Sequence, residues 1–339
     1  MKLAIHHRPG SFSERWIAYC DEQGIEYKIV NCYDSNIIEQ LKDCDALMWQ
    51  HNQSNVKDVL TAKRILFALE HTGFITFPDF KSGWHYDDKV AQKYLLEALG
   101  APMVPSYVFY DKEEALNWIN ITTFPKVFKL KGGASAMNVS LVKNKAEARK
   151  KVNKAFGKGF SQFNSFGYFK DRLNRFRNKK ETLLGVLKGF GRIFIPTEFA
   201  KKYVREKGYV YFQEFIPNNQ YDIRLIVIGD KAYGMKRKVR DGDFRASGSG
   251  EFVYDPIPED VIKIAFDVSE RLGFQSMAFD FIYDENHYPL IVEISYGFGT
   301  KGSSLCPGYW DRDLNWHEGD FNPFGWMVEN LIKKINQKK

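Results

Sequence analysis

The first 80 residues alternate between short apolar runs and longer segments of helical periodicity, and this alternation constrains the fold more than any other feature. Strand-like runs are expected at 2–5, 26–30 and 45–50, and a helical pattern follows each run. A strand, a crossover helix and a second strand form a unit in which the strands are parallel. We therefore predict that residues 1–82 form a small parallel sheet covered by helices.

The remainder of the chain is predicted to form two further parts. A helix is expected at 87–100, with an acidic N-cap and Gly100 at its end. Strand-like runs, a small-residue loop and a basic stretch follow it, and strong strands resume after about residue 208. We predict a second part at 83–208 and a third, an antiparallel sheet, at 209–339. The fold class is α/β (α+β).

Composition excludes several classes of protein. The 339 residues are 44% hydrophobic, which favours a globular chain with a substantial core. No run approaches the ~18 apolar residues of a spanning helix, and the N-terminus has no apolar segment typical of a secretory signal. The four cysteines show no C-x-x-C spacing, so we expect reduced thiols in a cytoplasmic protein.

The net charge of +7 is distributed unevenly along the chain. Residues 149–207 hold 17 Lys and Arg against 4 Asp and Glu, a local charge of +13, so the rest of the chain carries −6. This pattern argues against a nucleic-acid binder that uses the whole protein surface. It favours a local surface for an anionic partner, either an anionic membrane or an acidic polymer, although a solvated helical insertion has the same composition.

Two acidic residues interrupt the apolar runs of MAFDFIYDENHYPLIVEISYGFG (277–299). Asp280 lies between two phenylalanines, and Glu293 lies between Val and Ile. Because side chains alternate across a strand, Glu293 and Ser295 share one face, and Asp280 can face the same side from the adjacent strand. Buried carboxylates are costly unless they are paired or bind a cation, and oxygen ligands suit Mg²⁺. The alternative is that both acids pair with Arg or Lys.

Other segments carry residues suited to a nucleotide. Lys129 lies in FPKVFKLKGG, which runs into the small-residue loop GGASAM. Backbone N–H groups of such a loop can approach phosphates. In QEFIPNNQYDIRL, Glu214 and the backbone of Phe215 and Ile216 could contact adenine, with Asp222 near the ribose. Arg245, in GDFRASGSG, can neutralise phosphate charge.

In this order the segments resemble the ATP-grasp superfamily, and within it the RimK/glutathione-synthetase-like carboxylate–amine ligases. The resemblance covers roughly residues 75–300 and rests on FPKVFKLKGG, YFQEFIPNNQYDIRLIVIG, MKRKVRDGDFRASGSGEF and AFDFIYDENHYPLIVEISYG. It implies that 1–82 is a pre-ATP-grasp domain and 83–208 a lid subdomain with a basic insertion at 149–207. Residues 209–339 would then be the C-terminal subdomain with the metal site.

The resemblance also implies a role for each matched residue. Ser295 stands where relatives have Asn in an E-x-N pattern, and Ser247 replaces the Asn of FRSN, which weakens the third metal ligand. The cofactors implied are ATP and Mg²⁺. The implied roles are nucleotide contact for Lys89 and Lys129, adenine contact for Glu214, Phe215 and Ile216, ribose contact for Asp222, phosphate contact and catalysis for Arg245 and Arg237, and metal binding for Asp280, Glu293 and Ser295.

The chemistry implied by the resemblance is amide formation. A substrate carboxylate attacks ATP to give an acylphosphate, and an amine then displaces phosphate. The EISYGFG…CPGYWD combination and the aromatic residues of 309–326 resemble ATP-grasp proteins associated with surface polysaccharides, which implies a uronic acid as the carboxylate substrate. The alternatives are a peptide ligase and a catalytically silent ATP-binding module.

Two further expectations concern partners. The loop HHRPGSFSE follows the first strand, where α/β sheets place ligand loops, so Arg8 is a candidate for a substrate carboxylate; an ordinary surface loop is the alternative. The resemblance and the basic insertion predict a cytoplasmic protein that contacts the inner membrane face peripherally. Nucleic acid is not expected as a partner, and a homo-oligomer is compatible with the sequence.

Overall fold

The computed structural model describes residues 1–133, 138–161, 172–173, 176, 182, 184–185, 187–188, 190, 205–240, 243–246, 250–300 and 302–338. The chain forms two compact units. Unit 1 contains Met1–Tyr86, Leu95–Met103 and Asn218–Lys339, and unit 2 contains Asp87–Tyr94 and Val104–Pro217. Residues from both ends of the chain belong to unit 1 and share one core.

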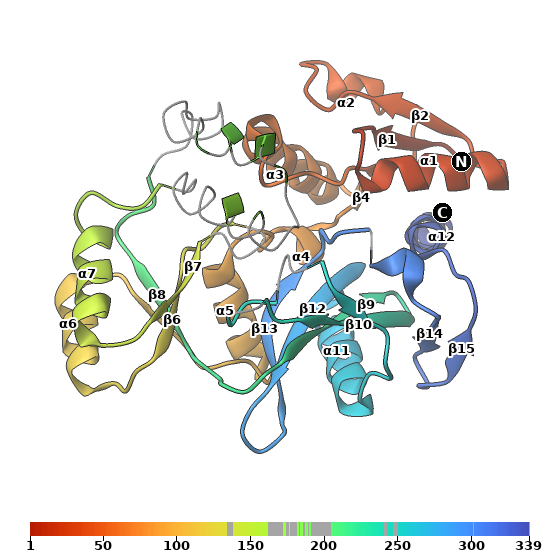
Figure 1. Ribbon diagram of the computed structural model, residues 1–339. Coiled ribbons are helices and arrows are strands. Elements are labelled where there is room, and N and C mark those ends of the chain that lie inside the picture. Colours follow the sequence, from red (N-terminus) through yellow and green to blue (C-terminus); the bar gives the residue numbers. More distant parts are fainter. Residues whose placement is uncertain are drawn as a thin grey trace. The chain divides into compact units, whose positions relative to one another are not determined.

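The N-terminal part of unit 1 is a parallel sheet of four strands in the order β2-β1-β3-β4, drawn in red to orange in Figure 1. This arrangement confirms the parallel sheet predicted from the alternation of strands and helices. Ser11 and Asn55 cap the N-termini of the two long helices with their side-chain oxygens. The strands are β1 (Leu3–His6), β2 (Tyr27–Val30), β3 (Ala46–Met48) and β4 (Ile75–Phe77), and the helices are α1 (Phe12–Gln23), α2 (Ile37–Gln40), α3 (Val56–His71) and the short α4 (Phe80–Gly83).

The C-terminal part of unit 1 is an antiparallel sheet of seven strands. The order is β13-β12-β9-β10-β14-β15, and β11 also pairs with β10. The strands are β9 (Tyr221–Ile228), β10 (Lys231–Lys238), β11 (Phe252–Val253), β12 (Ser276–Tyr283), β13 (Pro289–Ser295), β14 (Gly308–Asp311) and β15 (Trp316–Glu318). The helices of this part are α11 (Glu259–Leu272), the single-turn η1 (Ser303–Leu305) and α12 (Pro323–Lys338).

One hydrophobic core joins the two sheets of unit 1. Phe12 and Trp16 of α1 are fully buried in the same cluster as Phe324 and Val328 of α12. In both views α12 runs close to α1, and Tyr19 of α1 donates a hydrogen bond to Glu329 of α12 at 2.5 Å. The apolar residues of β9 and β12 also belong to this core, as does the inner face of α11. Burial of both chain ends in one core explains why unit 1 is discontinuous in sequence.

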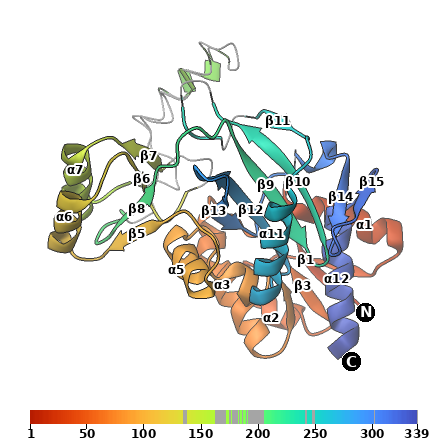
Figure 2. The ribbon, with the colours of Figure 1, turned by 90° about the horizontal axis from the view of Figure 1, so that it is seen from below.

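Unit 2 is a smaller antiparallel sheet of four strands in the order β5-β8-β6-β7. Its core contains Phe128 and Phe212 from neighbouring strands, together with Ile119 of α6 and Val152 of α7. Figure 2 shows α6 and α7 side by side next to this sheet. Helix α5 (Lys89–Leu99) begins in unit 2 and ends in unit 1, within the 87–100 helix predicted from the sequence. The remaining elements are β5 (Ser106–Phe109), α6 (Lys112–Ile121), β6 (Lys126–Lys129), β7 (Val139–Val142), α7 (Lys145–Ala155) and β8 (Val210–Glu214).

The basic insertion predicted at 149–207 begins inside α7, whose Lys151 and Lys154 lie over the ring of Phe160. Most of the insertion lies outside the described residues, as do Ser247 and the centre of the GGASAM loop.

Candidate functional site

Asp280 and Glu293 occupy directly facing positions on β12 and β13, as the alternation in the hairpin predicted. Ser295 faces Ala278 two pairs further along, so the two carboxylates and the hydroxyl lie on one face of the sheet. The register shifts between Asp280 and Phe281. This irregularity lies next to the acidic pair, and β-bulges commonly re-aim side chains beside functional sites.

Asp280 is held by two arginines from neighbouring strands. Arg224 of β9 donates from Nε to Oδ1 at 2.7 Å and from Nη2 to Oδ2 at 2.8 Å. Arg237 of β10 reaches Asp280 Oδ2 at 2.8 Å and also binds Asp222 through two hydrogen bonds of 2.7 and 2.6 Å. In this structure Asp280 therefore follows the alternative considered from the sequence, in which the acid pairs with arginine.

The four charged groups influence each other's protonation. Burial disfavours the charged form of Asp280, but the positive charges of Arg224 and Arg237 outweigh burial and hold its pKa well below the usual value. Burial is the largest influence on Asp222 and raises its pKa, although Arg237 opposes the shift. Asp280 is thus the carboxylate of this array that stays ionised, with its negative charge shared by the two arginines.

The donor set fits one Mg²⁺. Glu293 is half-buried beside Asp280, and the two acids supply carboxylate oxygens from adjacent strands. The described residues contain no cluster of three or more His, Cys, Asp and Glu that could hold a metal by itself. Two carboxylates are nevertheless the usual protein share of a Mg²⁺ site, because this ion keeps several waters and binds substrate phosphates.

The remaining predicted residues of unit 1 make local contacts. The hydroxyl of Ser295 donates to the carbonyl of Gly297 at 2.7 Å. Arg245 binds Asp243 through Nε and Nη2 at 2.8 and 2.5 Å. Arg237, predicted to lie beside Arg245 at the phosphates, spans Asp222 and Asp280, and its side chain is only 6% exposed.

Unit 2 holds both predicted nucleotide lysines, and each is buried. Lys89 begins α5, and its Nζ donates to the carbonyl of Gly133 at 3.0 Å, while its backbone N–H donates to Lys131. The N–H of Gly133 donates a hydrogen bond to the carboxylate of Asp87. The φ angle of Gly133 is +119°, a backbone conformation that glycine adopts readily. Lys129, at the end of β6, is 5% exposed. The contacts fix Lys89 against the start of the small-residue loop.

Glu214 has a partner that the sequence analysis did not identify. Lys126 on β6 faces Glu214 on β8, and its Nζ lies 2.8 Å from a carboxylate oxygen. Tyr107 donates a further hydrogen bond to Glu214 at 3.0 Å. Phe215 and Ile216 follow directly and are half-buried. The acid proposed for adenine is therefore oriented by two side chains.

For two of the residues that pair with the predicted acids, Lys126 and Arg224, the sequence contained an indication of the contact. Lys126 lies three residues before Lys129 in the same apolar strand, and a lysine in such a run needs an acidic partner. Arg224 lies two residues after Asp222, so the alternation of the strand places both on one face. Their partners could not be assigned, because pairing depends on strand order rather than on local pattern.

Comparison with known proteins identifies the fold. Residues 200–308 match the RimK-like ATP-grasp domain. Among solved structures, a RimK domain ATP-grasp protein from Sphaerobacter thermophilus is similar with a TM-score of 0.59 and 16% identity, covering 98% of this chain and 99% of that chain. N5-carboxyaminoimidazole ribonucleotide synthetase from Thermotoga maritima is similar with a TM-score of 0.58 and 14% identity. The match covers 98% of this chain and 75% of that chain. The ATP-grasp ligase PsnB, solved with a minimal precursor, Mg and ADP, is similar with a TM-score of 0.57 and 10% identity. The match covers 99% of this chain and 98% of that chain.

No curated protein matches this sequence. Similarity along the whole length of the chain, at 16% identity for the Sphaerobacter thermophilus structure, shows that the chain has the fold of these ATP-grasp structures. The comparisons confirm the fold class expected from the sequence, and residues 200–308 are the part similar to the RimK-like ATP-grasp domain.

Proposed function

We propose that this protein is an ATP-dependent carboxylate–amine ligase that joins an amino acid or amine to a uronic acid of a surface polysaccharide. The observation that carries the proposal is the facing pair of Asp280 and Glu293 on the polar side of an ATP-grasp sheet. The cofactor proposed for this pair is Mg²⁺, which would neutralise phosphate charge when it is bound. ATP is the second requirement.

We propose nucleotide roles for residues of each unit, considered by itself. In unit 2, Lys89 and Lys129 are proposed to meet the phosphates, and Glu214 with the backbone of Phe215 and Ile216 to meet adenine. In unit 1, Asp222 is proposed for the ribose, and Arg245 and Arg237 for charge that develops during phosphoryl transfer. Arg237 is paired with Asp222 and Arg245 with Asp243. To contact a phosphate, each arginine has to bind it in addition to the aspartate or release the aspartate.

The proposed reaction has two steps. An oxygen of the substrate carboxylate attacks the γ-phosphorus of ATP, the bond to the β-phosphate oxygen breaks, and ADP leaves. The amine nitrogen then attacks the acyl carbon, phosphate leaves with the electron pair of the C–O bond, and the nitrogen loses a proton. The protein forms no covalent bond to either substrate; it positions the reactants and neutralises charge.

The aromatic ribbon β14–β15 supports a saccharide as the acid. Trp310 and Trp316 face each other across the two strands with ring centroids 4.6 Å apart, and Trp316 is 42% exposed. An exposed indole face is suited to stacking on a sugar ring. Tyr309 and Phe321 pack against the core instead, and Phe324 and Trp326 are buried in it, so only part of the aromatic segment is available for this role.

Peptide ligation is a second candidate. It is supported by the similarity to PsnB, an ATP-grasp ligase solved with a precursor peptide and AMPPNP, which has a TM-score of 0.53 and 11% identity to this chain. In this version the amine or acid comes from a peptide terminus. Both candidates use the same ATP chemistry and differ only in the acceptor.

A substrate matrix with ADP detection tests these candidates. The full chain is incubated with ATP, Mg²⁺, one acid (glucuronate, galacturonate or a dipeptide) and one amine (an amino acid or ammonia). Turnover only with a uronic acid supports the main proposal, and turnover only with a dipeptide replaces it with peptide ligation. Binding of ATP without ADP release in any mixture would identify a silent ATP-binding module and refute both.

Two variants make this assay specific to the metal site. Glu293→Gln keeps the shape of the side chain and removes a charge, and we expect ADP release to fall by about 100-fold or more. Glu285→Gln changes an exposed acid in the turn of the same hairpin and should leave the rate unchanged. Equal rates for wild type and Glu293→Gln would contradict the assignment of the metal site.

Contact with an anionic membrane through 149–207 remains a proposal based on charge. Among the helices in the described part of the chain, none combines the length and the apolar character needed to cross a bilayer.

A further inference from the structure

The carboxyl-terminal edge of the parallel sheet holds a cation that has no acidic partner in the described part of the chain. Arg8 follows β1, and no acidic side chain among the described residues lies within ion-pairing distance of its guanidinium. Its Nε is buried and has no hydrogen-bond partner there. A buried donor on a charged group is costly when it is left unpaired. The position is notable because α/β sheets bind ligands at this edge.

The backbone around Arg8 is tightly fixed. The Arg8 carbonyl accepts from the Ser11 hydroxyl at 2.7 Å and from the Ser13 hydroxyl at 3.3 Å, and the Arg8 N–H donates to Ser13 Oγ at 3.1 Å. Gln50, just after β3, accepts from the N–H of Phe12 at 2.8 Å and joins the loop to the next strand. The loop is therefore held in one conformation, as preorganised binding requires.

Two more buried nitrogen atoms without partners lie beside the end of β3. They are Trp49 Nε1 and His51 Nε2, in side chains that are 1% and 4% exposed. The ring of Trp49 lies 4.8 Å from that of His6, the residue that ends β1. Burial lowers the pKa of His6, and the charge of Arg8 lowers it further, which is consistent with a guanidinium near this group.

Aromatic side chains cluster at this edge of the sheet. Tyr33 packs against both His6 and Trp49, with centroid distances of 4.9 and 5.9 Å. The acid in this cluster, Asp58, already accepts hydrogen bonds from the Tyr33 hydroxyl and from the N–H of Asn52. Asp58 is thus occupied and does not neutralise Arg8 by direct contact.

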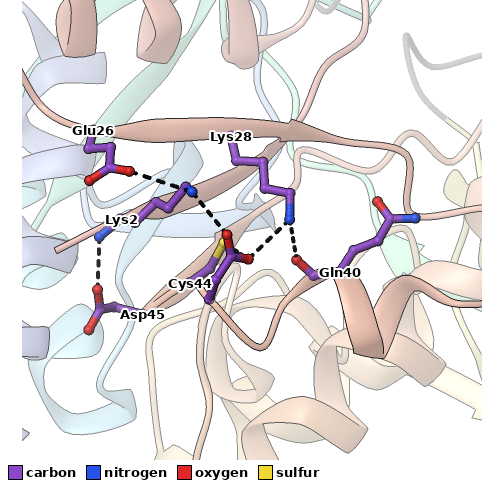
Figure 3. Close-up of polar contacts among 7 residues, drawn as sticks. Lys2, Glu26, Lys28, Gln40, Cys44 and Asp45 are labelled. Atoms are coloured by element: carbon purple, nitrogen blue, oxygen red, sulfur yellow. Dashed lines mark hydrogen bonds and ion pairs between the residues drawn. The ribbon is translucent and has the colours of Figure 1, made fainter.

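The opposite edge of the same sheet provides a contrast. Lys2 and Lys28 are both paired with Asp43, and Lys2 also reaches Glu26 (Figure 3). The backbone N–H of Lys2 donates a hydrogen bond to the side chain of Asp45. Lysines at the amino-terminal edge are thus neutralised by protein acids, whereas Arg8 at the carboxyl-terminal edge is not.

We propose that Arg8 binds a carboxylate of a substrate of the ligase reaction, and this inference rests on the proposed function. A guanidinium can hold a carboxylate through two parallel hydrogen bonds, which would satisfy Nε and neutralise the charge together. The carboxylate comes either from the uronic acid or from the α-carboxylate of an amino acid that supplies the amine.

Calorimetric titration of the full chain, with Mg²⁺ and AMP-PNP present, distinguishes the two sources. The probes are sodium D-glucuronate and L-alanine, each compared with its amide, D-glucuronamide or L-alaninamide. We expect one acid to bind at least about 10-fold more tightly than its amide, because a hydrogen bond to a charged group contributes on this scale. The acid that binds identifies the source. Equal affinity of both acids and their amides would overturn the proposal.

Variants connect the binding to Arg8. R8Q should abolish the preference for the acid, and R8K, which keeps the charge but not the planar pair of donors, should retain part of it. R15Q alters an exposed arginine on α1 and should bind as wild type does. Acid binding by R8Q that equals wild type would refute the assignment.

AMP-PNP affinity and the urea unfolding midpoint are measured for each variant, and both should stay at the wild-type value in R8Q. Loss of AMP-PNP binding by the wild-type chain would refute the proposed function. If the wild-type chain binds AMP-PNP but prefers neither acid over its amide, only the role of Arg8 is refuted.

Discussion

Arg224 holds Asp280 through two parallel hydrogen bonds, of 2.7 and 2.8 Å, across the β9–β12 strand pair. The pair is largely buried, with side chains 22% and 11% exposed, so each group depends on the other for its solvation. Such a pair contributes little net stability against an apolar replacement, but removal of one partner leaves a buried charge. The carboxylate proposed to bind Mg²⁺ is thus also a structural group.

The first prediction separates these two roles of Asp280. Asp280→Asn leaves Arg224 and Arg237 without their shared anion, and we expect a loss of about 3–5 kcal/mol in the free energy of unfolding. Urea unfolding of the full chain measures it. Asp267→Asn breaks an exposed pair with Arg271 and should cost less than about 1 kcal/mol. Similar losses for both variants would show that the array is not structurally important.

A second prediction concerns the pair in unit 2. Lys126→Met leaves Glu214 partly buried with Tyr107 as its remaining described partner, and we expect a loss of about 3 kcal/mol. In the double variant Lys126→Met/Glu214→Gln, much of the loss should be recovered, with a coupling energy of about 1–3 kcal/mol. The exposed pair of Lys263 and Glu259 provides the control cycle, in which coupling should stay below about 1 kcal/mol. Additive effects at 126 and 214 would contradict the pairing.

A third prediction follows from two buried histidines. Burial lowers the pKa of His51 to about 3 and of His85 to about 4, from an ordinary value of 6.5. The unfolded chain therefore binds protons that the folded chain does not, and stability is full above pH 6.5 and falls as the pH drops toward 4. At pH 5 each histidine should lower the free energy of unfolding by about 2 kcal/mol relative to its value above pH 6.5.

Urea midpoints at pH 7.5 and pH 5 measure this dependence. His51→Gln and His85→Phe should each reduce the difference between the two midpoints, whereas Gln at the exposed position His71 should not change it. An unchanged difference in both buried variants would mean that other groups cause the acid sensitivity.

The fourth prediction tests the basic insertion. With 17 cationic and 4 acidic residues in 149–207, the chain should sediment with vesicles that contain phosphatidylserine at low salt and be released at high salt. Vesicles of neutral lipid provide the comparison. No binding at low salt, where screening is weakest, would remove the membrane proposal, and binding that persists at high salt would indicate apolar insertion instead.

Local pattern was sufficient for much of this fold. The alternation of strands and helices determined the parallel sheet, the hairpin of β12 and β13 was visible in the sequence, and the two-residue period placed Asp280, Glu293 and Ser295 on one face. These are properties of neighbouring residues. They follow from the geometry of a strand or a helix without knowledge of the rest of the chain.

Only the tertiary structure decided which groups meet. The order β13-β12-β9-β10 brings Arg224 and Arg237 to Asp280, and the order β8-β6 brings Lys126 to Glu214. Similarly, α12 joins the core of the first helix across more than 300 residues of sequence. Strand order and core membership depend on long-range packing, which no local period encodes, and therefore the sequence determined the faces of the elements while the fold determined their partners.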